Sequence, residues 1–475
     1  MIVSRRSMIA GTAALAATPA LAAAKPDFAS KRPAPADRRF TSRAVERELA
    51  QVSARIGDAK LRWMFGNCYP NTLDTTVKMG MADGRPDAFV ITGDIPCLWL
   101  RDSAAQVKPY LHLAKGDADL QRLFRGLIGR QSRSILIDPY ANAFMEDPSA
   151  PTNLEWSLKD TTEMKPGVAE RKWEVDSLCY AMRLAHGYWR AVGDPAPFDA
   201  TWAAAARAIL RTFREQQRKH GPGPYSFLRS SNRNIETMPL GGWGNPARPN
   251  GLIQSGFRPS DDACQYPYLI PSNLFAVTSL RELAVVASEA RHDAELAREA
   301  TALAAEVEAA LRQHGTMRLP NGETVWAYEV DGYGNAMFMD DANVPSLSGL
   351  GYLGCVSMTD PLWQRTQRAA WSEANPYFFR GRAGEGIGGP HVGLRWIWPM
   401  SLIVRALSAT DDATIRACLR TLRDTDAGTG FIHEAFDQDD PAKFTRHWFA
   451  WANGLFGELI VTLARTRPHL LQDFA

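Results

Sequence analysis

The stretch HDAELAREATALAAEVEAALRQHG, residues 292–315, carries the pattern that decides the fold class of this chain. Its apolar side chains recur every three to four positions, at Leu296, Ala300, Leu303, Val307 and Leu311. This spacing lines one face of an α-helix. Asp293 and Glu295 suit the positive start of a helix, and Gly315 suits its end. The stretch therefore predicts a helix that packs one face against a core.

Further segments share this period and predict helices: 44–56, 176–192, 199–220, 272–290, 399–408, 413–423 and 451–465. Ser272 stands where it could cap its helix. Strand-like runs are few and short, at 88–92 and 324–330, and no alternation of strands and helices indicates a parallel sheet. We therefore expect an all-α fold, a toroid of helical hairpins whose long loops gather at one end.

Composition excludes several classes of protein. The chain has 475 residues, with 54 Lys plus Arg against 52 Asp plus Glu, a formal net charge of +2. A nucleic-acid binder would show a basic excess, and a hydrophobic fraction of 45% is too high for a disordered chain. Beyond the N-terminus no apolar run reaches the roughly 20 residues of a membrane helix. We expect neither a nucleic-acid partner nor a membrane partner.

The first residues have the form of a targeting signal. Arg5 and Arg6 precede a short, weakly apolar stretch, and residues 20–22 and 22–24 each have the A-x-A form of a cleavage site. The arginine pair favours twin-arginine export over an ordinary secretion signal. We therefore predict a bacterial periplasmic or secreted protein. Its predicted parts are an export signal, a Pro-rich linker and a single domain: 1–24, 25–40 and 41–475.

A Trp–Arg–Asp group stands in the first of several polar loops. Residues 94–103, DIPCLWLRDS, place Trp99, Arg101 and Asp102 just before a predicted helix. An indole offers a flat apolar face to a sugar ring, while Arg and Asp offer the donors and acceptors that vicinal hydroxyls need. A buried Arg–Asp pair at a helix start, with Trp99 in the core, is an equally good interpretation.

Two adjacent carboxylates stand in the loop 257–264, FRPSDDAC. Asp261 and Asp262 repel each other, which can raise the pKa of one and keep that group protonated as an acid. A solvated acidic turn is the alternative, although Arg258 and nearby tyrosines make exposure less favourable. In the earlier run WEVDS, residues 173–177, Asp176 is best interpreted as a helix N-cap.

Two later loops add polar side chains. Residues 339–345, MDDANVP, hold Asp340, Asp341 and Asn343, whose oxygens suit calcium or sugar hydroxyls, but the spacing is not that of an EF-hand. Residues 384–393, GEGIGGPHVG, lack the strand and the Lys-Ser/Thr ending of a phosphate loop. This glycine-rich turn is better interpreted as presenting His391 and, in the run that follows it, Trp398.

A single glutamate stands between apolar residues in FIHEAF, residues 431–436. A half-buried carboxylate at Glu434 can activate water, with His433 or His447 nearby to tune it. An exposed acid beside the acidic run 437–440 is the alternative. Neither an H-E-x-x-H nor a G-x-S-x-G motif is present, and the six cysteines form no C-x-x-C pair. We expect no metal and no cofactor.

Together, the recurring pairs of carboxylates and aromatics are typical of carbohydrate sites. Long runs of the chain also resemble glycoside hydrolase family 125 from about residue 45 to the C-terminus: DIPCLWLRDS, FRPSDDACQYPYLIPSN, MDDANVPSLSGLGYLG, GGPHVGLRWIWPMSL and FIHEAF…RHWFAWANGLFGELI. The resemblance implies a metal-independent exo-α-1,6-mannosidase with an (α/α)6 barrel. Its implied substrate is an α-mannoside, either mannan or an oligosaccharide derived from N-glycans.

The resemblance also implies roles for individual residues. The family is inverting, so Asp261 is the implied general acid and Glu434 the implied base, with Asp262 as the alternative acid. Inversion requires carboxyl groups roughly 6.5–9.5 Å apart. The terminal mannose is expected to contact Trp99, Arg101 and Asp102. Its further expected companions are Asp262, Asp340, Asp341, Asn343, His391 and His447.

Two other functions stay open at this point. The same barrel can support an inverting glycosidase of different sugar specificity, or an uronate lyase, which would need a Tyr or His base. A non-catalytic periplasmic glycan-binding protein would bind mannosides without releasing product, and it would not need two separated carboxyl groups.

Overall fold

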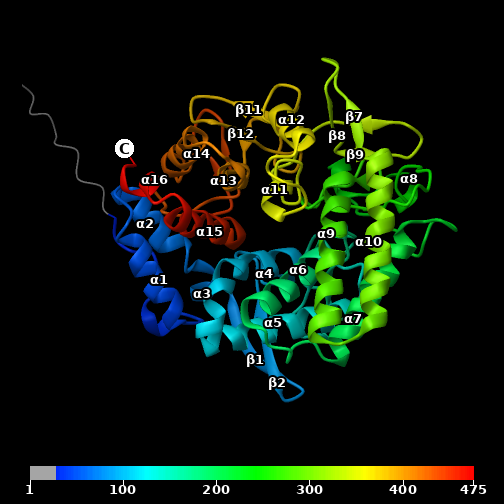
Figure 1. Cartoon of the computed structure of the whole chain (residues 1–475), viewed down its shortest axis with the longest axis horizontal. Coiled ribbons are helices and arrows are strands. Elements are labelled where there is room, and N and C mark those ends of the chain that lie inside the picture. The colour runs from blue at the N-terminus through cyan, green and yellow to red at the C-terminus, as the bar shows by residue number, and fades with distance from the viewer. Residues whose placement is uncertain (1–27, 475) are drawn as a thin grey trace, which may run out of the picture.

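Helices dominate the computed structural model, which describes residues 28–474 (Figure 1). The predicted export signal and the first residues of the predicted linker lie outside the described residues. The described part contains 16 α-helices. They are α1 (Arg43–Ser53), α2 (Ala59–Cys68), α3 (Asn71–Thr75), α4 (Leu100–Val107), α5 (Ala118–Ile137), α6 (Val175–Val192), α7 (Ala200–Gln216), α8 (Pro239–Gly242), α9 (Ile270–Val285), α10 (Ala294–His314), α11 (Leu350–Leu353), α12 (Pro361–Ala370), α13 (Pro399–Ser408), α14 (Asp412–Asp424), α15 (Ala450–Thr466) and α16 (His469–Gln472).

The helix predicted from residues 292–315 is confirmed as α10. The Asp293 carboxylate accepts a hydrogen bond from the Leu296 amide at 3.0 Å and so caps the helix, while the predicted apolar face is buried. Helix α9 differs from its prediction. It begins at Ile270 with Pro271 in its first turn, and the buried Ser272 hydroxyl has no hydrogen-bond partner, so the predicted Ser272 cap is wrong.

Short antiparallel strands occur throughout the loops, so the expected all-α fold is only partly right. The strands are β1 (Val77–Ala82), β2 (Arg85–Val90), β3 (Leu98–Trp99), β4 (Ala143–Phe144), β5 (Val168–Glu170), β6 (Tyr268–Leu269), β7 (Thr316–Arg318), β8 (Thr324–Trp326), β9 (Glu329–Val330), β10 (Ala336–Met337), β11 (Phe378–Arg380), β12 (Glu385–Ile387), β13 (Trp396–Ile397), β14 (Ala435–Asp437) and β15 (Phe444–Thr445). They pair in sheets of two or three strands. Most are too short to leave a period-2 signal in the sequence.

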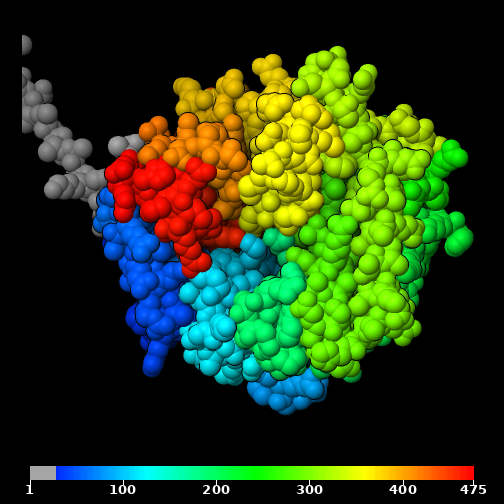
Figure 2. Space-filling view, viewed as in Figure 1, coloured from blue at the N-terminus to red at the C-terminus, as the bar shows by residue number. Residues whose placement is uncertain are grey.

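The chain travels once around the molecule from α1 to α16 (Figure 1). Helices α4, α6, α9, α11, α13 and α15 each contact the next helix in this order, and α15 returns to contact α4. Helices α5, α10 and α14 pack outside this series, against α6, α9 and α13. Figure 2 shows the N-terminal and C-terminal segments meeting on the surface, where α15 also contacts α1 and α2.

One large apolar cluster extends from Val45 in α1 to Phe474 near the C-terminus, so all parts of the ring share a core. All six cysteines are unpaired, and all but Cys355 are buried. None of the helices within residues 28–474 is long and apolar enough to cross a membrane.

The described part of the predicted linker packs against this body. The Arg32 side chain, 9% exposed, forms ion pairs with Glu46 of α1 and with Asp74 of α3. The distance between Arg32 Nε and Asp74 Oδ2 is 2.7 Å. These ion pairs hold the segment before α1 against helices α1 and α3.

Candidate active site

Loops from many parts of the chain, between Thr92 and Phe449, line a cavity of about 450 Å³. Small sheets fix these loops, since β3, β6 and β13 lead directly into α4, α9 and α13. An isolated bridge between Gly93 and Phe449 joins the first of these loops to the last. Seven predicted site residues line the cavity: Trp99, Arg101, Asp102, Asp261, Asn343, His391 and Glu434.

Arg101 is the buried centre of one wall, with a side chain only 4% exposed. Its NH1 atom lies 2.6 Å from Glu174 Oε2 and 3.4 Å from Asp176 Oδ2, and its Nε lies 3.4 Å from Asp102 Oδ1. The Arg–Asp pair is buried, as the structural interpretation of this loop predicted, and it also lines the cavity; sugar binding by this loop stays a prediction. The N-cap interpretation of Asp176 is wrong, because Glu174 occupies the N-cap position of α6 and Asp176 pairs with Arg101 instead.

Three carboxyl groups share this one guanidinium. Burial raises the pKa of Asp176 to about 6 and the pKa of Glu174 well above its usual range, against the opposing charge of Arg101. Burial also raises the pKa of Asp102. Burial therefore favours the protonated form of all three carboxyl groups, and the charge of Arg101 opposes it.

Asp261 has the left-handed backbone conformation, with φ of 68°. This conformation is costly for a residue with a side chain and is typical of functional sites. The tight turn is closed by the Asp261 amide, which donates to the Arg258 carbonyl at 2.9 Å, and by a bridge between Phe257 and Ala263. The turn places Asp261 on the cavity wall and sends Asp262 into the interior.

The surroundings of Asp261 favour its ionised form. Burial alone would raise its pKa, but Lys172, Arg101 and a hydrogen bond from Glu174 outweigh burial and lower the pKa of Asp261 to about 2. The Lys172 ammonium donates to the Asp261 carbonyl at 2.8 Å, and Asn142 Nδ2 donates to its carboxylate at 3.3 Å. The surroundings of the pair therefore favour the ionised form of Asp261 and the protonated form of Glu174.

Asp262 supports the cavity from behind. Its carboxylate, 0% exposed, lies 3.1 Å from His391 Nδ1. Burial opposes a charge on His391, but the hydrogen bond and charge of Asp262, with Asp261 and Glu434 adding, raise the pKa of His391. The expected repulsion between the two adjacent aspartates is avoided, because the turn points them to different partners.

Asp340 and Asp341 are also buried and do not line the cavity. Asp340 accepts hydrogen bonds from the Leu347 and Ser348 amides at 2.7 and 2.9 Å, and burial raises its pKa to about 7. Asp341 accepts from Ser260 Oγ at 2.7 Å and from Asn343 Nδ2 at 3.1 Å. These carboxylates organise the loops that carry cavity residues, rather than reaching the cavity themselves.

Glu434 lies on a different loop, at the start of β14, and is 8% exposed. The Thr445 hydroxyl donates to Glu434 Oε2 at 2.9 Å, and Arg446 NH1 lies 3.5 Å from Oε1. Arg446 is itself held by Asp94, with Nε 3.0 Å from Oδ2. A carboxylate fixed at one edge by a hydroxyl and a guanidinium is suited to orient and activate water.

Neither predicted histidine partner contacts Glu434. His447 is exposed, packs on the Phe444 ring at 4.8 Å and does not line the cavity. His433 is buried, and its ring nitrogens face the Arg446 carbonyl and the Thr429 hydroxyl. The basic side chain beside Glu434 is therefore Arg446 and not one of the two predicted histidines.

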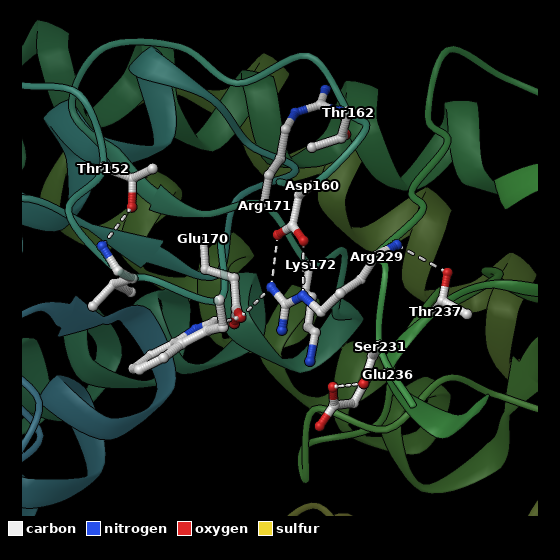
Figure 3. Close-up of polar contacts among 12 residues, drawn as sticks. Thr152, Asp160, Thr162, Glu170, Arg171, Lys172, Arg229, Ser231, Glu236 and Thr237 are labelled. Atoms are coloured by element: carbon white, nitrogen blue, oxygen red, sulfur yellow. Dashed lines mark hydrogen bonds and ion pairs between the residues drawn. The ribbon is translucent and has the colours of Figure 1, made fainter. Parts of the chain in front are cut away.

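Sequence reasoning missed one whole wall of the cavity. Its residues come from the loop before β5, from the end of β5 and the segment after it, and from the segment before α8: Trp156, Glu170, Lys172, Arg229, Arg233 and Glu236. Figure 3 shows Arg229 between Asp160 and Glu170, with Lys172 close by. The neighbouring Glu155 and Trp156 repeat the acid–aromatic pattern of the other loops, which is the one signal that could have revealed this wall.

The cavity mixes cations and carboxylates around polar and aromatic surface, which suits the hydroxyls and C–H faces of a neutral sugar. Among residues 28–474, no group of three or more His, Cys, Asp or Glu side chains is arranged to hold a metal ion.

Known proteins resemble this chain over most of its length. The family model of the metal-independent α-mannosidases of glycoside hydrolase family 125 matches residues 58–461. The meiotically up-regulated gene 157 protein of Schizosaccharomyces pombe is 43% identical over 460 residues, which cover 94% of this chain and 90% of that protein.

Solved structures agree with this match. A Streptococcus pneumoniae structure, described as a metal-independent α-mannosidase in a non-productive complex with α-1,6-mannobiose, has a TM-score of 0.86 and 39% identity. The match covers 90% of this chain and all of that chain. A bacterial glucoamylase complexed with acarbose has a TM-score of 0.53 at 12% identity, over 89% of this chain and 59% of that one, and shows a shared fold alone.

The expectation of a bacterial, exported protein is wrong on these findings. The curated relative at 43% identity is a fission-yeast protein, so the location inferred from residues 1–24 is not supported and is withdrawn. The family assignment does not depend on that segment, because the matched region begins at residue 58. The chain, matched over well more than half its length, therefore belongs to the metal-independent α-mannosidases of glycoside hydrolase family 125.

Proposed function

We propose that this α-mannosidase removes a non-reducing terminal α-1,6-linked mannose with inversion at the anomeric carbon. The observation that carries the proposal is the pair of carboxyl groups, Asp261 and Glu434, that face one cavity from loops far apart in the sequence. Their surroundings differ, since Asp261 lies near Lys172 and Arg101 and is hydrogen-bonded to Glu174, whereas Glu434 is held by Thr445 and Arg446. Two carboxyl groups with separate roles are what glycoside hydrolysis needs.

In the proposed reaction Asp261 is the general acid and Glu434 the general base. Asp261 gives its proton to the glycosidic oxygen as the bond between that oxygen and the anomeric carbon breaks. Glu434 takes a proton from a water molecule, whose oxygen forms the new bond on the opposite face of the sugar. The products are β-mannose and the shortened glycan, and solvent resets both carboxyl groups.

The acid needs a proton, and the surroundings of the pair favour the protonated form of its neighbour Glu174. A bound sugar expels water from around Asp261, and desolvation raises the pKa of a carboxyl group. The hydrogen bond between Glu174 and Asp261 then offers a direct route for the proton. Glu174 is thus proposed as the proton reservoir of the acid.

The remaining cavity residues are proposed to hold the terminal mannose. Trp99 offers a ring face, and Arg101, Asp102, Asn343 and His391 offer hydrogen-bond partners to the hydroxyls. The complex of the Streptococcus pneumoniae relative with α-1,6-mannobiose supports an oligomannoside substrate, from mannan or from N-glycans.

The proposal extends to the architecture. We propose that α4, α6, α9, α11, α13 and α15 form the inner ring of an (α/α)6 barrel, because each contacts the next and the last contacts the first. Residues 41–475 would then act as one catalytic domain.

A panel of α-1,2-, α-1,3-, α-1,4- and α-1,6-linked mannobioses tests linkage, and α-1,6-mannotriose tests the mode of attack. The expected result is cleavage of the α-1,6 linkage, with mannose and mannobiose as the first products of the trisaccharide. Comparable turnover of the other linkages would overturn the linkage assignment. Binding of mannosides without any product would instead favour a glycan-binding protein.

A further inference from the structure

An exposed tryptophan stands on the wall that the sequence did not predict. Trp156 lines the cavity, yet its side chain is 43% exposed. Its indole Nε1 donates a hydrogen bond to Glu170 Oε1 at 3.2 Å. An indole that is exposed and also fixed by its one donor leaves an apolar ring face available to a ligand.

A chain of buried charges holds this indole in place. Glu170, at the end of β5 and 2% exposed, accepts from Arg229 NH2 at 2.9 Å. The Arg229 guanidinium is forked on Asp160, at 2.7 Å from Nε and 2.6 Å from NH2 (Figure 3). The Asp160 carboxylate is itself 0% exposed. Such a network fixes the orientation of a surface ring more firmly than packing of an exposed side chain can.

The backbone around Trp156 is fastened as well. Thr161 and Leu228 exchange two backbone hydrogen bonds at 2.8 and 3.1 Å, which tie the Trp156 loop to the Arg229 loop. The Thr152 hydroxyl donates to the Ala169 carbonyl at 2.7 Å and accepts from the Leu154 amide at 3.2 Å. The loop is therefore built as a fixed support.

The position of this wall relative to the proposed acid gives it a role. Asn142 Nδ2 lies 3.0 Å from Glu170 Oε2 and 3.3 Å from Asp261 Oδ1, so one amide connects the support of Trp156 to the acid. Lys172, on the same wall, binds the Asp261 carbonyl. The acid protonates the oxygen that leaves, and so the group that leaves lies on the side of the cavity where Asp261 stands.

We propose that Trp156 is the platform on which the mannose residue of the leaving group stacks, and that it thereby determines the preference for an oligomannoside over a mannoside with a small leaving group. The inference rests on the proposed function. Polar groups that line the same cavity, at Lys172, Arg233 and Glu236, can bind the hydroxyls of that sugar.

The test compares two substrates of the full chain. α-1,6-Mannobiose has a leaving sugar, whereas α-mannosyl fluoride has only fluoride in that place. Trp156→Ala is expected to lower kcat/KM for mannobiose about tenfold and to change kcat/KM for the fluoride less than about twofold. Trp156→Phe, which keeps a flat ring, is expected to retain most of the mannobiose activity.

Trp243→Ala is the matched control. Trp243 is also 43% exposed but does not line the cavity, so its removal is expected to leave both activities unchanged. Thermal melting checks that each variant is folded, and Trp156→Leu supplies the same comparison if Trp156→Ala does not fold.

Three results would overturn the inference. Equal losses on both substrates would show that Trp156 supports the fold of the site rather than the leaving sugar. Unchanged turnover of mannobiose by Trp156→Ala would show that no sugar stacks there, while the proposed function stands. A wild-type protein that hydrolyses neither substrate would refute the proposed function, and with it the inference.

Discussion

Arg101→Met removes a cation that lies beside three buried carboxyl groups. Glu174 and Asp176 are fully buried around the guanidinium, and Asp102 lies beside it. Breaking a buried ion pair by deleting one partner costs about 3–5 kcal/mol. Unfolding entropy near ~2.1 cal/mol/K per residue gives ~1 kcal/mol/K for 475 residues, so the melting temperature should fall by ~3–5 °C at pH 7.5.

The loss of stability should depend on pH in a definite direction. Burial already raises the pKa values of these carboxyl groups, to about 6 for Asp176. A group whose pKa is raised by folding favours the folded state below its unfolded pKa, near 4, and this contribution is lost as pH rises through the folded pKa. Without Arg101 these pKa values rise further. The difference in melting temperature between Arg101→Met and the wild type should therefore be largest above about pH 7 and shrink toward pH 5.

Thermal melting monitored by circular dichroism between pH 5 and pH 8 measures this difference. Arg312→Met is the matched control, because Arg312 is 65% exposed and pairs with Glu308 on the surface, where an ion pair contributes at most about 1 kcal/mol. Two results would refute the role given to Arg101. One is a fall in melting temperature for Arg101→Met that equals the fall for Arg312→Met, and the other is a fall that grows toward pH 5.

The other predictions concern turnover. Asp261→Asn should lower kcat for α-1,6-mannobiose by about 10²–10⁴-fold and affect α-mannosyl fluoride far less, because fluoride needs little help from an acid; if Asp262→Asn shows this pattern instead, the acid is its neighbour. Glu434→Gln should abolish turnover of both substrates while the melting temperature stays within a few degrees, and residual activity near wild type would exclude Glu434 as the base. Glu174→Gln should slow mannobiose cleavage more than fluoride cleavage and change the acid limb of the pH profile, whereas an unchanged profile would remove Glu174 from proton supply. Activity should survive EDTA, as the family description implies, and a loss restored by calcium would contradict it.

Helix periodicity located several helices that have one buried face, but it did not find all of them. Helix α13 has the predicted bounds, and α10 is shorter than its predicted segment by two residues at the start and one at the end. Helix α5, at 20 residues, was not predicted. Its Gly126 meets the backbone of Asp87 and Ala88 in β2, a close approach that only the folded chain reveals.

Local patterns predicted part of the contents of the site, but they did not predict how its residues are connected. Aromatic and acidic residues side by side identified Trp99, Asp261 and Glu434 as cavity residues. The assignment of Asp176 as a cap failed because its partner, Arg101, is 75 residues away in the sequence. A backbone turn decides which of two adjacent aspartates faces the cavity, and the left-handed φ of Asp261 has no signature in residue type.

The remaining wall depends on contacts between distant segments. Arg229 is 69 residues from Asp160 and 59 from Glu170, so neither ion pair has a local signal. Likewise, Arg446 reaches Asp94 across 352 residues, because the bridge between Gly93 and Phe449 closes the ring. Long-range ion pairs of this kind are fixed by the fold and cannot be inferred from one sequence.

The central claim is that Asp261 and Glu434 act as acid and base of an inverting reaction on an α-1,6-linked mannose. Proton NMR of the first mannose released from α-1,6-mannobiose tests activity, linkage and stereochemistry together. The account predicts that the β-anomer appears first and converts to the α-anomer only by mutarotation. Initial release of the α-anomer would mean retention, with carboxyl groups about 5 Å apart and Glu434 or its partner acting as a nucleophile, and would contradict the account.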